Sequence, residues 1–283
     1  MAAPPARTYR HIEVQPVAGA LGAEIRGVNL AASLSDEVIA EIRRAFLDHL
    51  AIFFRDQKLT PQEQLAFASR FGEPMEYPQL KGLPEAPMIT PVVKLEHEQI
   101  NFGGVWHSDT TYLTRPPMAS MLYAVELPPY GGDTIFANQY LAYETLSDGL
   151  RRTLDGLVGV NTSAKADASK TREERLRSAG VEMKVLVGEH PVVRTHPETG
   201  RRALYVNVGH TAHFKGWTEE ESRPLLDYLF HHQVRLEFTC RLQWQPGSLA
   251  FWDNRCAQHN AVNDYAGFRR IMHRVTLAGD VPR

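Results

Sequence analysis

Two stretches in the first quarter of the chain carry apolar residues at the spacing of an amphipathic helix. The first, 34–50, can be capped by Ser35, and its apolar residues share one face: Val38, Ile39, Ile42, Phe46 and Leu50. The second opens with the capping box Thr60-Pro61-Gln62-Glu63, and we expect it to run to Phe71 with Gly72 as its stop. Both helices should pack one apolar face on a core.

Short apolar runs between Gly, Pro and polar turns fill most of the remaining chain and predict strands. The runs expected as strands are 12–17, 23–28, 51–54, 88–95, 119–126, 134–137, 191–194, 203–206, 236–244, 249–252 and 270–277. Two further helices are expected, one over 140–157 and one from the capping box of Thr218 and Glu221 towards His232. Many strands with scattered helices and no repeat predict a mainly β protein with flanking helices around a double-stranded β-helix (jelly-roll) core.

The length of the chain is compatible with a single domain. Its 283 residues, of which 43% are hydrophobic, are enough to bury a sizeable core. We therefore expect one domain over 1–283. The polar stretch at about 164–183 is expected as a mobile insertion, and the proline-punctuated stretch at about 74–104 as a lid segment.

Charge and cysteine content exclude several classes of protein. The net charge is −2 without a long basic block, so nucleic-acid binding has no electrostatic support. No apolar run approaches the roughly 18 residues of a membrane span, and the N-terminus lacks the apolar core of a secretory signal, which favours a cytoplasmic protein. Cys240 and Cys256 fit neither a disulfide framework nor a CxxC zinc site, and Cys256 is expected as a packed thiol.

Two histidines and one aspartate supply candidate metal ligands. His107 and Asp109 lie two residues apart, and His259 follows far downstream. On one strand the first pair would point to the same face, and two imidazoles with one carboxylate form the ligand set of non-haem Fe(II) oxygenases. His-x-Asp alone is weak, because with 12 histidines about one match is expected by chance. A hydrogen-bonded strand histidine and a zinc hydrolase remain as alternatives.

Two arginines indicate binding of anions. Arg270 and Arg274 are four residues apart on a predicted strand and so share one face. Buried charges need partners, and guanidinium groups pair with carboxylates through two parallel hydrogen bonds. Anionic ligands are therefore the natural partners, with salt bridges to protein carboxylates as the alternative. Thr134 can add a hydroxyl to the same anion, although an ordinary strand threonine is the simpler interpretation of this residue taken alone.

The remaining histidines give weaker signals. His210 and His213 have no acidic residue nearby in the sequence and are expected as loop histidines. His231 and His232 lie near the end of a predicted helix, where imidazolium suits the helix dipole. None of these four is expected to take part in the chemistry.

Taken together, the motifs resemble those of the taurine dioxygenase family of Fe(II)/2-oxoglutarate-dependent oxygenases. The resemblance covers almost the whole chain. The segments that carry it are GAEIRGV (22–28), RFGE (70–73), WHSD (106–109), GGDT (131–134), WDNR (252–255) with His259, and RRIMHR (269–274). Their order and spacing make the resemblance highly specific.

The resemblance implies a role for each candidate residue. His107, Asp109 and His259 would ligate Fe(II), while Thr134 and Arg270 would hold the far carboxylate of 2-oxoglutarate. The enzyme would use O2 to hydroxylate its substrate and release succinate and CO2. Arg274 matches the arginine with which family members bind the anionic group of their substrate. The fold implied is again the jelly roll.

The substrate is less determined than the reaction. Members acting on taurine carry a histidine just after RFGE, but here that segment reads PMEYP (74–78), with Tyr77 as the expected replacement. Tyr77 and Phe102 suit an apolar anion such as a sulfonate, sulfate ester, aryloxyalkanoate or other carboxylate, unless they only pack the lid. A small organic anion is thus the expected partner, and a homo-oligomer stays open. The alternative function is a non-catalytic anion-binding protein on the same fold.

Overall fold

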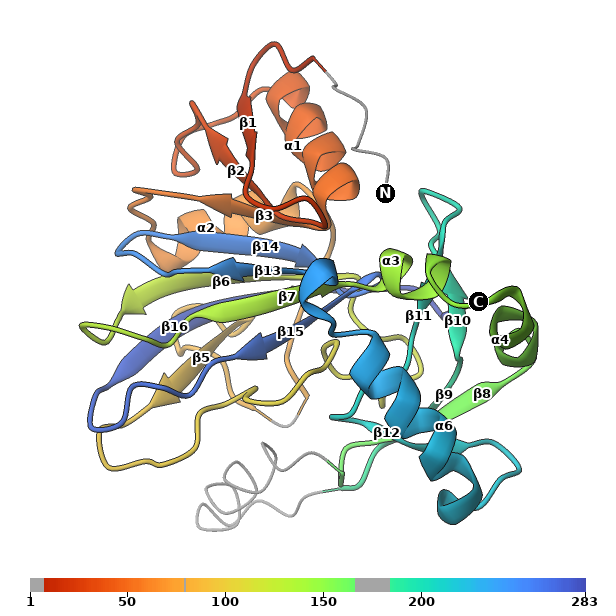
Figure 1. Cartoon of the computed structure of the whole chain (residues 1–283). Coiled ribbons are helices and arrows are strands. Elements are labelled where there is room, and N and C mark those ends of the chain that lie inside the picture. The colour runs from red at the N-terminus through yellow and green to blue at the C-terminus, as the bar shows by residue number, and fades with distance from the viewer. Residues whose placement is uncertain (1–7, 79, 166–183) are drawn as a thin grey trace.

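A large, almost entirely antiparallel sheet forms the centre of the structure, a computed structural model that describes residues 8–78, 80–165 and 184–283 (Figure 1). Its strand order is β1-β2-β3-β14-β6-β16-β4, with β5 also paired to β16. The strands are β1 (Glu13–Pro16), β2 (Ala23–Arg26), β3 (Ala51–Phe54), β4 (Pro74–Met75), β5 (Ile89–Lys94), β6 (Ala119–Glu126), β14 (Leu249–Asp253) and β16 (Arg270–Leu277). Among the described strands, only β2 and β3 pair in parallel.

A smaller sheet faces the large one. It has the order β13-β7-β15, with β13 (Thr239–Leu242), β7 (Thr134–Asn138) and β15 (Ala257–Ala261). Short strands outside this pair of sheets form two further ladders: β12 (Thr211–Phe214), β8 (Val158–Thr162) and β9 (Val187–Pro191) in one, and β10 (Val193–Thr195) with β11 (Arg202–Leu204) in the other. The predicted mainly β double sheet is confirmed.

Alternating side chains of the central strands supply two separate cores. All four residues of β3 are buried, but their side chains alternate between two cores. Ile52 and Phe54 pack with helices α1 (Asp36–His49) and α2 (Pro61–Ser69), whereas Phe53 packs with Phe136 of the smaller sheet. The neighbouring strand β14 divides in the same way. This explains why the central strands read as unbroken apolar runs, since both faces of the large sheet are covered.

The first two helices begin where their caps predict. Helix α1 (Asp36–His49) is capped by Ser35 and ends at Leu50, which has a positive φ of 64°. Helix α2 (Pro61–Ser69) has both hydrogen bonds of the capping box of Thr60. Its predicted end is wrong, because the helix stops before Arg70, where tight turns replace helical bonds and Phe71 bonds back to Ala68.

Two other predictions need correction. The single helix expected over 140–157 is two helices, α3 (Gln139–Glu144) and α4 (Asp148–Leu154), because Ser147 is extended and caps the second. The strand expected over 236–244 begins as a 3₁₀ turn and becomes β13 only at Thr239. Most of the predicted mobile insertion, 166–183, lies outside the described residues.

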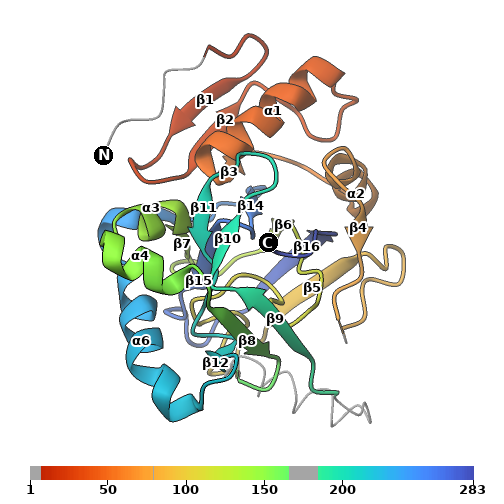
Figure 2. The same cartoon turned by 90° about the vertical axis from the view of Figure 1, so that its right-hand side faces the viewer.

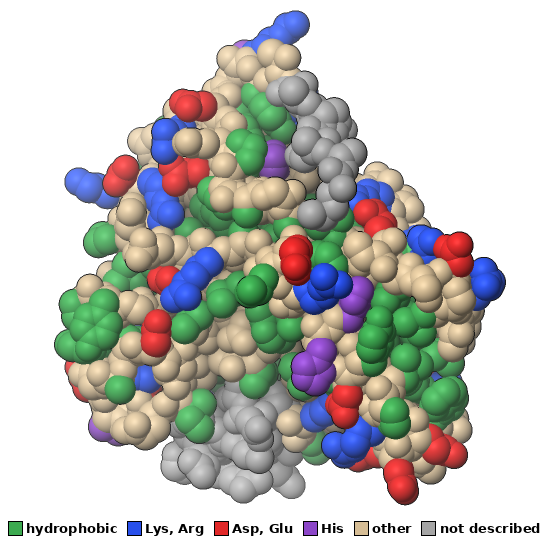
Figure 3. All heavy atoms as spheres, in the orientation of Figure 1, with side chains coloured by type: hydrophobic (Ala, Val, Ile, Leu, Met, Phe, Trp, Pro, Cys, Tyr) green, Lys and Arg blue, Asp and Glu red, His purple; other side chains and the backbone are tan. Residues whose placement is uncertain are grey.

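Helix α6 (Glu219–His232) has the predicted capping box of Thr218 and Glu221. Figures 1 and 2 both show α4 and α6 on the side of the molecule opposite α2, so that helices flank the sheets on two sides. Figure 3 shows acidic and basic side chains interspersed over the described part of one face. Among the described helices, none is long and apolar enough to cross a membrane.

Candidate active site

His107, Asp109 and His259 meet in the buried interior. One ligand atom from each lies within 4.8 Å of the others. The two histidines are joined by paired backbone hydrogen bonds, His107 N–H to His259 O at 3.1 Å and His259 N–H to His107 O at 2.9 Å. His259 lies on β15, which continues the smaller sheet, so the ladder brings the two imidazoles together.

Asp109 reaches the cluster by a turn and not by strand alternation. His107 forms an isolated bridge, and the chain turns directly after it, with Thr110 at a φ of 43°. The expectation that one strand presents both side chains is therefore wrong. The turn is fixed by Ser108, whose hydroxyl donates to Ala257 O at 2.9 Å, and by Leu113, whose N–H donates to Thr110 O at 3.0 Å.

The hydrogen bonds around the cluster fit a divalent cation. His107 Nδ1 lies 2.7 Å from Val105 O, so it carries the proton and leaves the Nε2 lone pair directed at Asp109 Oδ1, 3.6 Å away. Asp109 Oδ1 and His259 Nδ1 are buried and have no hydrogen-bond partner among the residues that the structure describes. Unpartnered buried polar atoms require an explanation, and a shared metal ion provides one for this cluster.

Burial and charge set the protonation of the cluster. Burial, reinforced by the neighbouring His107, lowers the pKa of His259 to about 3, so its imidazole is neutral near pH 7. Burial alone would raise the pKa of Asp109. The close approach of His107 and the positive charge of the Arg274 guanidinium outweigh it and hold that pKa well below its usual range. A neutral imidazole beside an ionised carboxylate is the state that binds a metal.

Strand β16 places two arginines on one buried face, as predicted. Arg270, Met272 and Arg274 alternate with more exposed residues and are each at most 4% exposed. Neither guanidinium is fully paired: Nε and Nη2 of both have no hydrogen-bond partner in the described part of the chain. Salt bridges to protein carboxylates therefore do not account for these four donors, whereas bound anions do.

Residues of the strands and their connecting turns surround Arg270. Its Cζ lies 5.6 Å from the ring centroid of Trp244, whose Nε1 donates to Thr134 Oγ1 at 3.0 Å. The Thr134 hydroxyl therefore keeps its own proton free to donate to an anion. Gly132, at a φ of 70°, lets the chain pass so close that a Cβ there would lie 3.3 Å from Arg270 Cδ. Burial lowers the pKa of Arg270, which an anionic partner would offset.

Arg274 lies between the metal-ligand cluster and two aromatic rings. Its Nη1 is 3.6 Å from Asp109 Oδ1. Its Cζ lies 3.8 Å from the ring centroid of Tyr77 and 5.3 Å from that of Phe102. The two rings approach edge to face, with centroids 6.3 Å apart. An anion bound by Arg274 would therefore lie beside the cluster and against an apolar wall.

His210 lies in the site although it was expected as a loop histidine. It is buried, with its ring centroid 5.9 Å from that of His107 and 5.0 Å from that of Tyr112. Its Nδ1 contacts Thr111 Oγ1 at 3.2 Å. Burial and the nearby His107 lower its pKa to about 3. Nothing in the local sequence signals this position, because it depends on packing against the turn that follows His107.

Cys256 is a packed thiol, as expected. It lies close to His196 and Asp253, but both oxygens of Asp253 already accept hydrogen bonds from Arg255, at 2.8 and 2.7 Å. His196 Nε2 adds a third contact to Asp253 at 3.0 Å. Burial raises the pKa of the Cys256 thiol well above its usual value. The cluster of His196, Asp253 and Cys256 therefore stabilises the turn before His259 and offers no thiolate to a metal.

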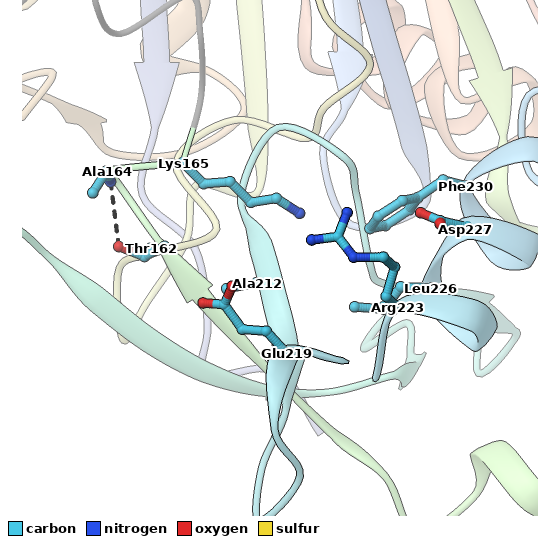
Figure 4. A pocket seen from close by; sticks show the side chains of 9 residues that line it. All are labelled: Thr162, Ala164, Lys165, Ala212, Glu219, Arg223, Leu226, Asp227 and Phe230. Carbon is cyan, nitrogen blue, oxygen red and sulfur yellow. Dashed lines mark hydrogen bonds between the residues drawn. The ribbon is translucent and has the colours of Figure 1, made fainter. Parts of the chain in front are cut away.

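A cavity of about 300 Å³ beside α6 is separate from this site. Its lining includes Thr162 of β8, Ala212 of β12 and several residues of α6. The lining includes no residue of the metal-ligand cluster and neither of the two β16 arginines. Figure 4 shows Lys165 and Arg223 pointing toward one another across it. We place no part of the reaction there.

Comparison with known proteins agrees with this geometry. The family model described as "Taurine catabolism dioxygenase TauD, TfdA family" matches residues 13–276. A sulfate ester dioxygenase of Pseudomonas putida, dependent on α-ketoglutarate (2-oxoglutarate), is 40% identical over an alignment of 279 residues that covers 96% of this chain and 91% of that protein. An alkylsulfatase of Acinetobacter baylyi is 36% identical over 282 residues, covering 96% of this chain and 86% of the relative.

Solved structures share the fold at similar identity. A putative α-ketoglutarate-dependent taurine dioxygenase from Burkholderia xenovorans has a TM-score of 0.83 and 42% identity, covering 96% of this chain and 94% of that one. The chain is thus a jelly-roll dioxygenase that uses Fe(II), 2-oxoglutarate and O2. It belongs to the TauD, TfdA family, as its motifs indicated.

Proposed function

We propose that this dioxygenase hydroxylates a small organic anion, with sulfate esters as the preferred class, and releases succinate and CO2. The observation that carries the proposal is the pair of incompletely paired arginines on β16, which gives one site two separate positions for anions. One position suits the dicarboxylate cosubstrate and the other the substrate. The two relatives named for sulfate esters and alkylsulfatase activity support this class.

The geometry of the site supports a role for each residue. His107, Asp109 and His259 hold the iron, which activates O2 when it is bound. Thr134 and Arg270 hold the far carboxylate of 2-oxoglutarate through the hydroxyl and two guanidinium donors. These groups orient the cosubstrate so that its other end reaches the metal.

Arg274 holds the anionic group of the substrate beside Asp109, so the adjacent carbon lies near the metal. Tyr77 and Phe102 belong to the segment 74–104, for which we propose the role of a lid within a single domain, and they form an apolar wall for the organic part. Hydroxylation of a carbon that bears a sulfate oxygen gives a product that breaks its C–O bond. An aldehyde and inorganic sulfate are then released.

A substrate screen tests this proposal. Protein loaded with Fe(II) is given 2-oxoglutarate and O2 together with alkyl sulfates, sulfonates, aryloxy acids or N-acyl amino acids, and succinate is measured. We expect medium-chain alkyl sulfates to raise succinate formation most, with equimolar sulfate, and His107→Ala to remove the response. Taurine should perform poorly, because the segment PMEYP (74–78) lacks the histidine that family members acting on taurine carry there. Taurine as the best substrate, or no anion that exceeds the background, would contradict the proposal.

A further inference from the structure

A row of buried hydrogen bonds leads to one oxygen of Asp109. Ser120 Oγ donates to Asp109 Oδ2 at 2.6 Å, and Asn254 Nδ2 donates to Ser120 Oγ at 3.0 Å. All three side chains are at most 1% exposed. A hydroxyl has a single proton, so the Ser120 hydroxyl that accepts from Asn254 directs its own proton at Asp109.

The amide of Asn254 is held in one orientation. Its Oδ1 accepts from Trp252 Nε1 at 3.0 Å and from the Asp109 backbone N–H at 3.3 Å. Two N–H donors facing this oxygen leave only the NH₂ group to face Ser120. The pairing of Trp252 on β14 with Ser120 on β6 brings these residues together, so the arrangement is part of the large sheet.

The same residues contact a second ligand of the metal-ligand cluster. The ring centroid of Trp252 lies 4.7 Å from that of His259. Trp252 therefore supports His259 through its ring and Asp109 through Asn254. Hydrogen bonds behind metal ligands set the orientation and basicity of those ligands.

We propose that Asn254 and Ser120 form a positioning relay that occupies Asp109 Oδ2 and leaves Oδ1 alone for the metal. The inference rests on the proposed role of Asp109 as a metal ligand. Its support is the asymmetry of the carboxylate, since Oδ2 has a short hydrogen bond whereas Oδ1 has none among the described residues and faces His107 Nε2. Coordination through one oxygen keeps a further position at the metal open, which a chelating cosubstrate and O2 both require.

Ser120→Ala tests the relay, with Mn(II) as a probe that needs no turnover. We expect the Mn(II) dissociation constant, measured by titration calorimetry on the metal-free protein, to rise about 10–100-fold. The 2-oxoglutarate dissociation constant of the Mn(II)-saturated variant should rise as well, because the released oxygen competes for a position at the metal. Ser120→Thr keeps the hydroxyl and should restore Mn(II) binding to within about threefold of the unsubstituted protein.

Ser248→Ala is the matched control. Ser248 is equally buried, and its hydroxyl accepts hydrogen bonds from Arg55 and from the Gln245 N–H. Neither of these bonds involves Asp109. Its removal therefore takes a buried hydroxyl from the same sheet region without touching the relay. We expect its Mn(II) dissociation constant to stay within about twofold of the unsubstituted value.

Asn254→Asp provides a second, nearly isosteric variant in case Ser120→Ala folds poorly. A carboxylate cannot donate to Ser120 and would draw the Ser120 proton away from Asp109, so Mn(II) binding should weaken at least as much. The relay is wrong if both variants bind Mn(II) within about threefold of the unsubstituted protein. If the unsubstituted protein itself binds Mn(II) no better than His107→Ala, the proposed metal site fails instead.

Discussion

The two arginines of β16 have the same side chain and the same buried face but different surroundings. Arg270 is enclosed by residues of the sheets and their turns, including Trp244 and a glycine that admits its side chain. Arg274 is enclosed by Asp109 on one side and by two aromatic rings on the other. Tyr77 lies in the connection between β4 and β5, and Phe102 lies in the connection between β5 and β6. One of the two proposed anion sites is thus part of the scaffold, and the other is completed by connecting segments.

This difference suggests that the surroundings of Arg270 serve the reaction itself, whereas the surroundings of Arg274 set the substrate specificity. A position built from paired strands changes little without disturbing the fold, which suits a cosubstrate that every turnover requires. A position completed by a connecting segment can change its lining while the metal ligands stay in place. Relatives of this chain are named for sulfate esters and for aryloxyalkanoates such as 2,4-dichlorophenoxyacetate, which is the pattern expected of such an arrangement.

The largest effect is expected on 2-oxoglutarate binding when Arg270 is substituted. Arg270→Met removes two unpartnered donors, each worth about 1.5–3 kcal/mol to a charged acceptor, so the 2-oxoglutarate dissociation constant should rise about 100-fold or more. Arg270→Lys keeps the charge but loses the two-pronged geometry and should give an intermediate loss. Binding is measured by calorimetry on Mn(II)-loaded protein. Retention of affinity within threefold in Arg270→Met would remove 2-oxoglutarate from this position.

Arg274→Met should affect the substrate and spare the cosubstrate. We expect KM for an alkyl sulfate to rise about 10–100-fold, because one charge-assisted partner of the anion is lost, while 2-oxoglutarate binding stays within threefold. Steady-state succinate formation and calorimetry measure the two quantities. An equal loss of affinity for both ligands would mean that the two arginines serve one anion.

The aromatic wall should have a smaller effect. Tyr77→Leu removes a ring stacked 3.8 Å from the guanidinium, which is worth about 1 kcal/mol and so about fivefold in KM for the alkyl sulfate. Phe102→Leu, at 5.3 Å, should cost about twofold. The two variants form a matched pair, read by the same succinate assay. The reverse order of effects would indicate that Phe102 is the main contact.

The smallest effect is expected on the stability of the metal-free protein, which should fall in acid because of the buried histidines and not because of the arginines. Burial lowers the pKa of His210 and His259 to about 3 in the folded, metal-free protein, against 6.5 for an ordinary histidine. The unfolded chain therefore binds more protons as pH falls from 6.5 to 3, and stability that is fully present above 6.5 is lost through that window.

His210→Gln isolates one of these histidines. Between pH 6 and pH 5, the slope of the unfolding free energy against pH should become smaller than in the unsubstituted protein. The difference should correspond to about one proton fewer taken up on unfolding, measured by denaturant titration of the metal-free form. His231→Gln, at an exposed histidine, is the matched control for the exchange of histidine for glutamine. An unaltered slope in His210→Gln would mean that His210 is not held neutral by its surroundings.

Features fixed by local chemistry were predictable from the sequence. The capping boxes at Thr60 and Thr218 start their helices, and the two-residue period of β16 places Arg270 and Arg274 on one face. Each of these depends on residues within a few positions of one another. The candidate metal ligands could also be named from the sequence, because their residue types and the motifs around them limit the chemistry.

Features that depend on long-range packing were not predictable. Asp109 comes to the cluster through a turn with Thr110 at positive φ, which no local signal announces. His210 is placed by the turn after His107, and Asn254 acquires its partner Ser120 only when β14 pairs with β6. The motif around Asn254 was visible in the sequence, but the role of its amide required the structure.

Visible absorption under anaerobic conditions tests most directly whether Arg270 binds 2-oxoglutarate and Arg274 binds the substrate. Fe(II) and then 2-oxoglutarate are added to the metal-free protein, and the charge-transfer band of their complex is recorded at equal cosubstrate concentration for each variant. We expect the band in the unsubstituted protein and in Arg274→Met, and its loss in His107→Ala and Arg270→Met. A band that survives in Arg270→Met but disappears in Arg274→Met would contradict the assignment of the two anion sites.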